Sequence, residues 1–262
     1  MKAQRLDKTL HVLHDKLEAA TEDTLAEYHR VLDFSWIYHD SALEGVVYNM
    51  EELKFGLEDQ PASSDGNDTA LIPVFDEIKQ NEAAIALIRE LAAKKRLTIS
   101  LDVIKKIYAT LAPEEVEGRA PPKYRKDMPL HRMYFHEISK PDKISYKMRQ
   151  LVTWMNSPDT RRATHTLRLA SKAHYQLLHI YPFPKQSGKV ARLLMNLILL
   201  RGGYPAAVIH ATERQRYYDA LKTSEDATAK IVTEALVASM NSALRFFEQE
   251  ASAQGGRRAR SA

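Results

Sequence analysis

The side chains best suited to chemistry gather between Tyr181 and Arg192, in a stretch that reads YPFPKQSGKVAR. Lys185, Lys189 and Arg192 place three cations around Gly188, just ahead of an apolar run. We expect that run to begin a helix, whose first turn has free N–H groups and the positive end of the helix dipole. Helix N-termini of this kind bind anions, so the stretch predicts a phosphate site. A solvated basic turn between two core helices is the alternative that these residues leave open.

The same stretch does not match the P-loop of nucleotide-binding proteins. That motif is G-x-x-x-x-G-K-[ST] and follows a strand. Phe183 stands where the first glycine is required, and Val190 stands where a hydroxyl group would reach magnesium. A helical pattern also precedes the stretch, so the P-loop interpretation fails on three counts.

Helical periodicity dominates the rest of the sequence, which has only 9 glycines. Pro182 and Pro184 end the helix before the cationic stretch, and Gly202 and Gly203 end the helix after it. We predict helices near residues 6–17, 24–38, 74–94, 100–111, 146–156, 162–180 and 188–201, and two more between 212 and 249. Ser100 is the expected cap of the helix at 100–111.

Residues 112–145 break this pattern. They are rich in proline and show no helical period, so we predict an irregular connection that holds a short β-hairpin at 123–136. We also expect the basic end of the chain, residues 250–262, to be disordered.

Composition narrows the classes of protein further. The 262 residues carry a formal net charge of +4, which permits acidic partners and does not by itself argue for nucleic acid. Cysteine is absent, so thiol catalysis and cysteine-ligated zinc are excluded. No apolar run reaches the length of a membrane span, and the N-terminal residues are amphipathic rather than a signal peptide. We therefore expect a cytoplasmic protein that binds neither membranes nor nucleic acid.

The cationic stretch and its flanks resemble the Fic (Fido) family. The family pattern is HPFxxGNGRxxR, followed by a helix that ends in LLMNLLLLRxGYPP, where this chain has LLMNLILLRGGYPAAVI. KAHYQLLHI, PPKYRK, LVTWMN and ERQRYYDAL are further segments that look like the family's. YHDSALEGVVYNMEEL is similar to the inhibitory segment (S/T)xxxE(G/N) of some members. The resemblance covers residues 28–221.

The resemblance implies an all-α fold with a β-hairpin flap near residues 123–136. It divides the chain into N-terminal helices with an inhibitory-type segment (1–70), a Fic core (71–249) and the tail (250–262). Most members transfer AMP from ATP to a hydroxyl group of a target protein. In those members the loop histidine is the general base, an acidic residue holds magnesium, and the glycines, asparagine and arginines hold phosphates.

This chain departs from that pattern at the positions that carry the chemistry. Tyr181 stands at the base position, and a phenol with an ordinary pKa of about 10 is a poor base at neutral pH. Lys185 puts a cation at the magnesium position, so the resemblance implies a lost metal site. Gln186 replaces a glycine, Ser187 replaces asparagine, and Lys189 replaces arginine, which keeps the charge and loses the bidentate fork.

Other positions match the family. Gly188 and Arg192 are kept, and Glu44 stands where the family has its inhibitory glutamate, with Asp40 in place of the serine or threonine. We expect Glu44 to pair with Arg192, either as a structural ion pair or as a regulatory one. Tyr124 and Arg125 lie in the flap region, where the family positions its target chain.

Two histidines precede the base position. His174 falls on a histidine of the family's AHYQ segment, and we expect it to be packed and hydrogen-bonded. His179 lies two residues before Tyr181 and should point to a different face of the helix. We therefore expect neither histidine to replace the missing base.

Three functions remain open. The sequence favours a catalytically impaired Fic protein that binds a nucleotide or phosphate at residues 186–192, or a partner protein at the flap. The alternative is an active transferase with altered chemistry, such as another phosphate donor or modification of Tyr181 itself. A transcription-linked regulator is the third, although no helix-turn-helix is evident. ATP or another nucleotide is the expected ligand where there is one, and a homo-oligomer is not excluded.

Overall fold

The computed structural model describes residues 2–58, 72–116, 118, 120–129 and 136–260. These residues form helices and irregular connections, with no strand among them, so the expected all-α class is confirmed. The helices are α1 (Lys2–Ala19), α2 (Glu22–Leu43), α3 (Met50–Leu57), α4 (Ile72–Ala93), α5 (Leu101–Leu111), α6 (Pro141–Asn156), α7 (Pro158–Ala163), α8 (Thr166–Ile180), α9 (Ser187–Arg201), α10 (Arg214–Thr223) and α11 (Glu225–Arg260), with short 3₁₀ turns η1 (Pro113–Glu115) and η3 (Ala211–Glu213).

Polar side chains set several helix starts. The Thr21 hydroxyl accepts the N–H of Thr24 at the start of α2, and Ser100 accepts the N–H of Val103 at the start of α5. Asn49 and Glu52 form a reciprocal capping box at α3. The predicted cap at Ser100 is therefore confirmed.

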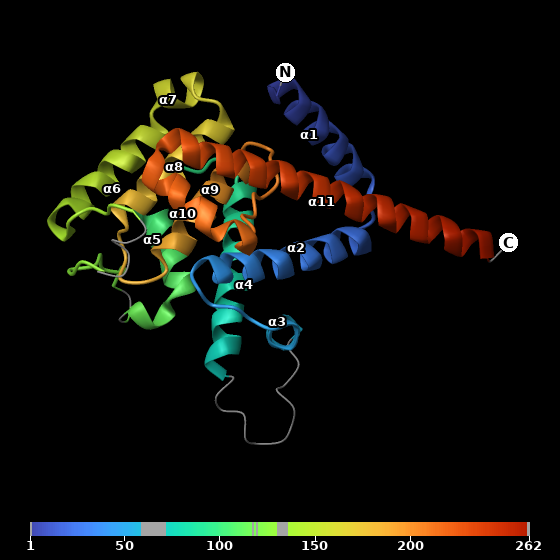
Figure 1. Cartoon of the computed structure of the whole chain (residues 1–262), viewed down its shortest axis with the longest axis horizontal. Helices are drawn as coiled ribbons and strands as arrows, with labels where there is room; N and C mark the ends of the chain where they lie inside the picture. Colours follow the sequence, from blue (N-terminus) through green and yellow to red (C-terminus); the bar gives the residue numbers. More distant parts are fainter. Residues whose placement is uncertain (1, 59–71, 117, 119, 130–135, 261–262) are drawn as a thin grey trace.

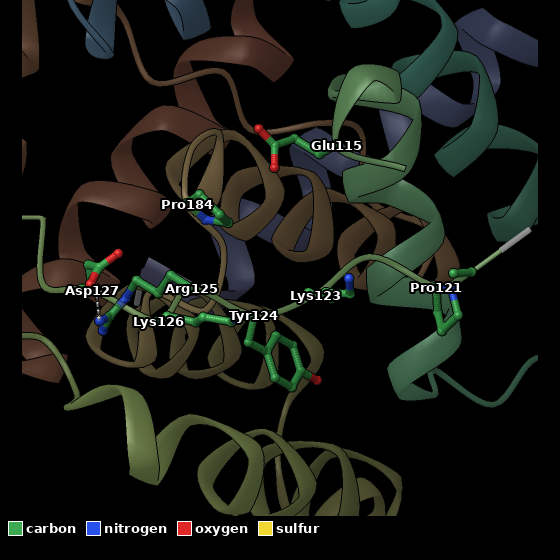
Figure 2. A pocket seen from close by; sticks show the side chains of 9 residues that line it. Glu115, Pro121, Lys123, Tyr124, Arg125, Lys126, Asp127 and Pro184 are labelled. Carbon is green, nitrogen blue, oxygen red and sulfur yellow. Dashed lines mark hydrogen bonds between the residues drawn. The ribbon is translucent and has the colours of Figure 1, made fainter. Parts of the chain in front are cut away.

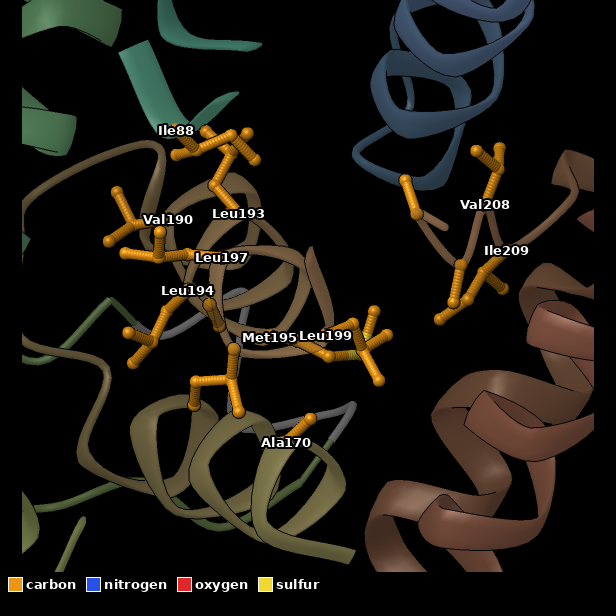
Figure 3. Close-up of a cluster of buried hydrophobic side chains, with 14 of the residues drawn as sticks. Ile88, Ala170, Val190, Leu193, Leu194, Met195, Leu197, Leu199, Val208 and Ile209 are labelled. Carbon is orange, nitrogen blue, oxygen red and sulfur yellow. The ribbon is translucent and has the colours of Figure 1, made fainter. Parts of the chain in front are cut away.

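Helix α9 lies at the centre of the molecule, and α8 and α4 pack against it (Figure 1). Every residue from Ser187 to Leu199 is buried. Figure 3 shows its apolar side chains directed toward Ile88 of α4 and Ala170 of α8. A helix that is buried all round places even its first-turn cations inside the protein, where they need partners.

Two expectations about the chain's irregular parts differ from the structure. Residues 120–129 have no regular secondary structure, and 130–135 lie outside the described residues, so the predicted hairpin at 123–136 is not seen. Prolines at 121, 122 and 129 lack the N–H groups that a strand ladder needs. Residues 250–260, where we expected disorder, continue α11 as helix, although Gly255 and Gly256 are poor helix formers. Figure 1 shows this helix running out past the rest of the fold.

Helices long and apolar enough to cross a membrane do not occur in the described part of the chain.

Candidate functional site

The loop between α8 and α9 holds two residues in the left-handed backbone region. Tyr181 has φ 48° and closes α8 through its N–H to the Leu177 carbonyl, at 2.8 Å. Gln186 has φ 58° and precedes α9. No other residue besides glycine has positive φ in the ranges that the structure describes. Such a conformation costs a side-chain-bearing residue on the order of 1 kcal/mol or more, so the contacts around the loop must offset the strain at Tyr181 and Gln186.

Short contacts fix the interior of this loop. The Ser187 hydroxyl accepts the N–H of Phe183 at 2.9 Å and donates to the Phe183 carbonyl at 3.1 Å. The Phe183 ring stacks on Tyr108 of α5, with centroids 3.9 Å apart. Both hydrogen bonds of the Ser187 hydroxyl are therefore made within the loop. Tyr181 is also buried, with 2% of its surface exposed.

Lys185 is bound by two carboxylates of η1. Its ammonium lies 2.6 Å from Glu114 Oε1 and 3.3 Å from Glu115 Oε1. The hydrogen bond to Glu114 raises the pKa of Lys185 against the smaller effect of burial, so it is charged at neutral pH. The residues do not fit a magnesium ion here, because an ammonium group already holds the nearby carboxylates.

Glu44, the residue that follows α2, lies against the start of α9. A Cβ built on Gly188 would come within 2.0 Å of Glu44 Oε1, so the carboxylate fills the space that this glycine leaves. Arg214 Nε and the Tyr218 hydroxyl donate to the Leu43 carbonyl at 3.0 and 3.1 Å, which fixes the end of α2 there. A carboxylate in this place meets the positive end of the α9 dipole.

Arg192 is held from two sides by α2. Its Nη2 donates to Glu44 Oε1 at 2.9 Å, so the predicted pair is present, and its Nε donates to Asp40 Oδ1. Nη2 also reaches the Asp40 carbonyl at 3.3 Å. Burial works to lower the pKa of Arg192, but Asp40 and Glu44 outweigh it and raise that pKa well above its usual value. The arginine is therefore a permanent cation between two carboxylates.

Lys189 turns away from the loop and into the core. Its ammonium donates to Glu77 Oε1 of α4 at 3.0 Å and to the Ser41 hydroxyl at 3.2 Å, and the side chain is 1% exposed. Lys185, Lys189 and Arg192 thus each have at least one carboxylate partner in the folded protein.

Arg125 points inward rather than toward solvent. Its Nε donates to the Tyr181 carbonyl at 2.6 Å, its Nη2 donates to the Ser139 carbonyl, and its backbone N–H donates to Pro182 O at 2.9 Å. A cation at the carbonyl end of α8 stabilises that helix and fastens residues 120–129 to the loop.

Tyr124 lines a groove of about 280 Å³ beside the loop. Figure 2 shows its walls, with Glu115 and Pro184 on one side and Lys123, Tyr124 and Lys126 on the other. Lys105 lies over the Tyr124 ring at 5.1 Å, which adds another cation to this edge.

His174 and His179 are packed away from the loop. His174 is fully buried against the Tyr217 hydroxyl at 2.9 Å, and burial lowers its pKa to about 3. His179 Nδ1 lies 2.9 Å from the Tyr175 carbonyl, and its ring lies 4.0 Å from that of Tyr175. The predicted packing and hydrogen bonding of His174 are confirmed.

Comparison with known proteins agrees with this arrangement. The profile of the Fic/DOC family matches residues 98–199, which include α8, the loop and most of α9. This chain belongs to the Fic family. Curated relatives named protein adenylyltransferase Fic are 29% identical over 231 residues in Culex quinquefasciatus and 31% identical over 192 residues in Aedes aegypti. These alignments cover 85% and 72% of this chain and 43% and 36% of the relatives, so the chain spans less than half of their length.

Solved Fic structures share the fold at lower identity. A Fic domain containing signaling protein from Bacteroides thetaiotaomicron is 20% identical with a TM-score of 0.75, over 92% of this chain and 98% of that one. Fic-1 from C. elegans is 22% identical with a TM-score of 0.73, over 95% and 74%.

Four carboxylates that bind the cations of residues 181–192 were not predicted as their partners: Asp40, Glu77, Glu114 and Glu115. Asp40 could have been found, because it lies four residues before Glu44 and shares its face of α2. Glu77 lies 112 residues from Lys189, and no local pattern connects them.

Proposed function

We propose that this Fic protein does not transfer AMP, and that it acts by binding a protein partner while its loop is held closed. The position of the Glu44 carboxylate, against Gly188 at the start of α9, is the observation that carries the proposal. A nucleotide phosphate would need the same space and the same dipole.

The chemistry of the loop supports the absence of transfer. A positioned general base contributes about 10²- to 10⁴-fold to catalysis, and Tyr181 is a buried phenol at that position. Lys185 cannot ligate a metal, because its ammonium is protonated and has no lone pair, and it also occupies the carboxylates of Glu114 and Glu115. Nucleotide binding is the weaker version of the proposal, because it requires Glu44 to leave first.

The groove beside Tyr124 supports the proposal that the protein binds a protein partner. Residues 121–127 run there outside any strand ladder, although the Arg125 N–H is bound to Pro182 O, and an extended segment of another protein would lie along them in the groove. A β-hairpin flap would form in that complex. The relatives' name, protein adenylyltransferase, supports a protein rather than a small molecule as the bound species. We also propose a cytoplasmic location.

Labelled ATP with magnesium and cell extract tests the transfer. We expect no label on any protein above the level of a sample without the Fic protein. Labelling by the wild type that disappears in Tyr181→Phe would contradict the proposal and favour an active transferase with altered chemistry.

Site-specific photocrosslinking tests the partner. A crosslinker at position 126 should capture one defined protein, and Tyr124→Ala in the same background should abolish that capture. Lys106→Glu, an exposed change on α5 outside the groove, is the matched control and should leave capture unchanged. Equal capture by both variants would contradict a partner in the groove.

A further inference from the structure

Helix α2 presents two carboxylates to Arg192, and the family resemblance accounts for only one of them. Asp40 and Glu44 are four residues apart and lie on the same face of α2. Asp40 Oδ1 accepts from Arg192 Nε, while Glu44 Oε1 accepts from Nη2 at 2.9 Å. The two carboxylates therefore hold different edges of one guanidinium.

This cluster is nearly dry. The Arg192 side chain is 3% exposed, and those of Asp40 and Glu44 are each 10% exposed. Two carboxylates on one guanidinium leave an excess negative charge next to the start of α9, in surroundings that screen charge poorly. A polyphosphate that displaced Glu44 alone would still face Asp40.

We propose that Asp40 is a second inhibitory carboxylate, which keeps Arg192 bound to α2 after Glu44 has been displaced. The inference rests on the proposed closure of the loop and adds a residue to it. A nucleoside polyphosphate can pair with the Arg192 guanidinium only when both carboxylates have released it.

The remaining donor of Arg192 shows why one release is insufficient. Nη1 is buried, has no hydrogen-bond partner among the described residues, and lies 3.2 Å from the Cβ position of Gly188. While Asp40 still accepts from Nε, a phosphate that takes the place of Glu44 beside Gly188 can accept hydrogen bonds from Nη1 and Nη2. It is then repelled by the Asp40 carboxylate on the other edge of the same guanidinium. The attraction between Arg192 and phosphate is then largely cancelled.

Isothermal titration calorimetry with ATP tests the inference on four proteins: wild type, Glu44→Gly, Asp40→Ser, and the double variant. We expect no measurable binding to the wild type or to Asp40→Ser, and weak or absent binding to Glu44→Gly. The double variant should bind at least about tenfold more tightly than Glu44→Gly. The gain from Asp40→Ser then depends on the absence of Glu44, which a merely structural role would not produce.

The matched control is Asp33→Asn in the Glu44→Gly background. Asp33 is another carboxylate of α2, paired with Arg89 at 2.5 Å and away from the loop. It should leave ATP affinity unchanged. If the double variant melts below the temperature of the titration, Asp40→Asn/Glu44→Gly replaces it, because the amide keeps the shape of the carboxylate without its charge.

Two results would overturn the inference. In one, Glu44→Gly alone binds ATP as tightly as the double variant; in the other, the double variant is folded and does not bind ATP. Neither result bears on AMP transfer by the wild type, so failure of the inference is distinguishable from failure of the proposed function.

Discussion

The Arg192 side chain is 3% exposed, and its carboxylate neighbours offset the cost of burying its charge. A buried cation without partners is very costly, and a buried pair that loses one partner leaves the other charge uncompensated. Here a single arginine compensates two carboxylates, Asp40 and Glu44, which come from a helix about 150 residues earlier in the chain. Stability and closure of the loop therefore depend on the same side chain.

Replacement of Arg192 by alanine should destabilise the protein strongly. Breaking a buried pair costs about 3–5 kcal/mol, which lowers the melting temperature of a domain of this size by roughly 10 °C. Arg216→Ala is the control, because Arg216 pairs with Glu213 and Glu234 while half-exposed, and such pairs contribute about 0–1 kcal/mol. Thermal melts of both variants without ligand decide the matter, and equal melting temperatures would mean that the Arg192 cluster is solvated.

At the scale of elements, the contact that matters is the end of α2 on the start of α9. Gly188 makes it possible, since a side chain at this position would collide with the Glu44 carboxylate. The α2 end is fixed in turn by α10 through the Leu43 carbonyl. Closure of the loop is thus a property of three packed helices rather than of the loop sequence.

The effect of Gly188→Ala should change sign with the residue at position 44. In the wild type the new methyl group must displace Glu44 from Arg192, so the melting temperature should fall. In a Glu44→Gly background only the 3.2 Å approach to Arg192 Nη1 remains, at the end of a long side chain that Glu44 no longer holds. Alanine should then stabilise the helix over glycine, by at most about 1 kcal/mol. Chemical denaturation of the four proteins, with glycine or alanine at position 188 and glutamate or glycine at position 44, measures the free energies of unfolding that decide this.

Gly56→Ala is the control for that cycle. Its Cβ would meet Ile78 of α4 at 2.7 Å, away from the loop, so it should destabilise both backgrounds equally. A Gly188→Ala effect that is the same in both backgrounds would contradict the placement of Glu44.

Local signals predicted the elements better than the contacts between them. Apolar periodicity placed α5 and α9, and Ser100 was identified as a cap from its type and position alone. Helix α2 was predicted to end near residue 38, but it continues through Asp40 and Ser41 to Leu43, with Glu44 as its C-cap. Its three polar residues there meet the cations of α9, which is tertiary information that a helical pattern does not contain.

At the scale of the whole molecule, two histidines join distant segments through their neutral forms. His39 of α2 stacks on His210 with centroids 4.1 Å apart and accepts the N–H of Ala211. His174 of α8 contacts the Tyr217 hydroxyl of α10. Burial lowers the pKa of His39 to about 4, with His210 adding to the effect, and burial, with a smaller contribution from Arg192, lowers that of His174 to about 3.

These shifts predict a loss of stability in mild acid. The unfolded chain binds protons at these two histidines below its ordinary pKa of about 6.5, whereas the folded protein does so only near 4 and 3. The unfolded state then carries more protons, so the free energy of unfolding falls as the pH drops from about 6.5 toward 4. Each such group contributes a slope of up to about 1.4 kcal/mol per pH unit.

Denaturant titrations at pH 7.5, 6.0 and 5.0 measure that slope in the wild type, His174→Gln and His39→Gln. Each variant should be less stable at pH 7.5, since a packed ring is lost, but its stability should fall less steeply toward pH 5.0. Carboxylates held by cations, such as Glu114 with its lowered pKa, add their own loss only at lower pH, below about 4.5. His11→Gln, on an exposed residue of α1, controls for the change in composition. If the slope between pH 7.5 and 5.0 is the same in all four proteins, the two buried histidines are protonated in the folded state, and the packing of α2 and α8 described above must accommodate their charge.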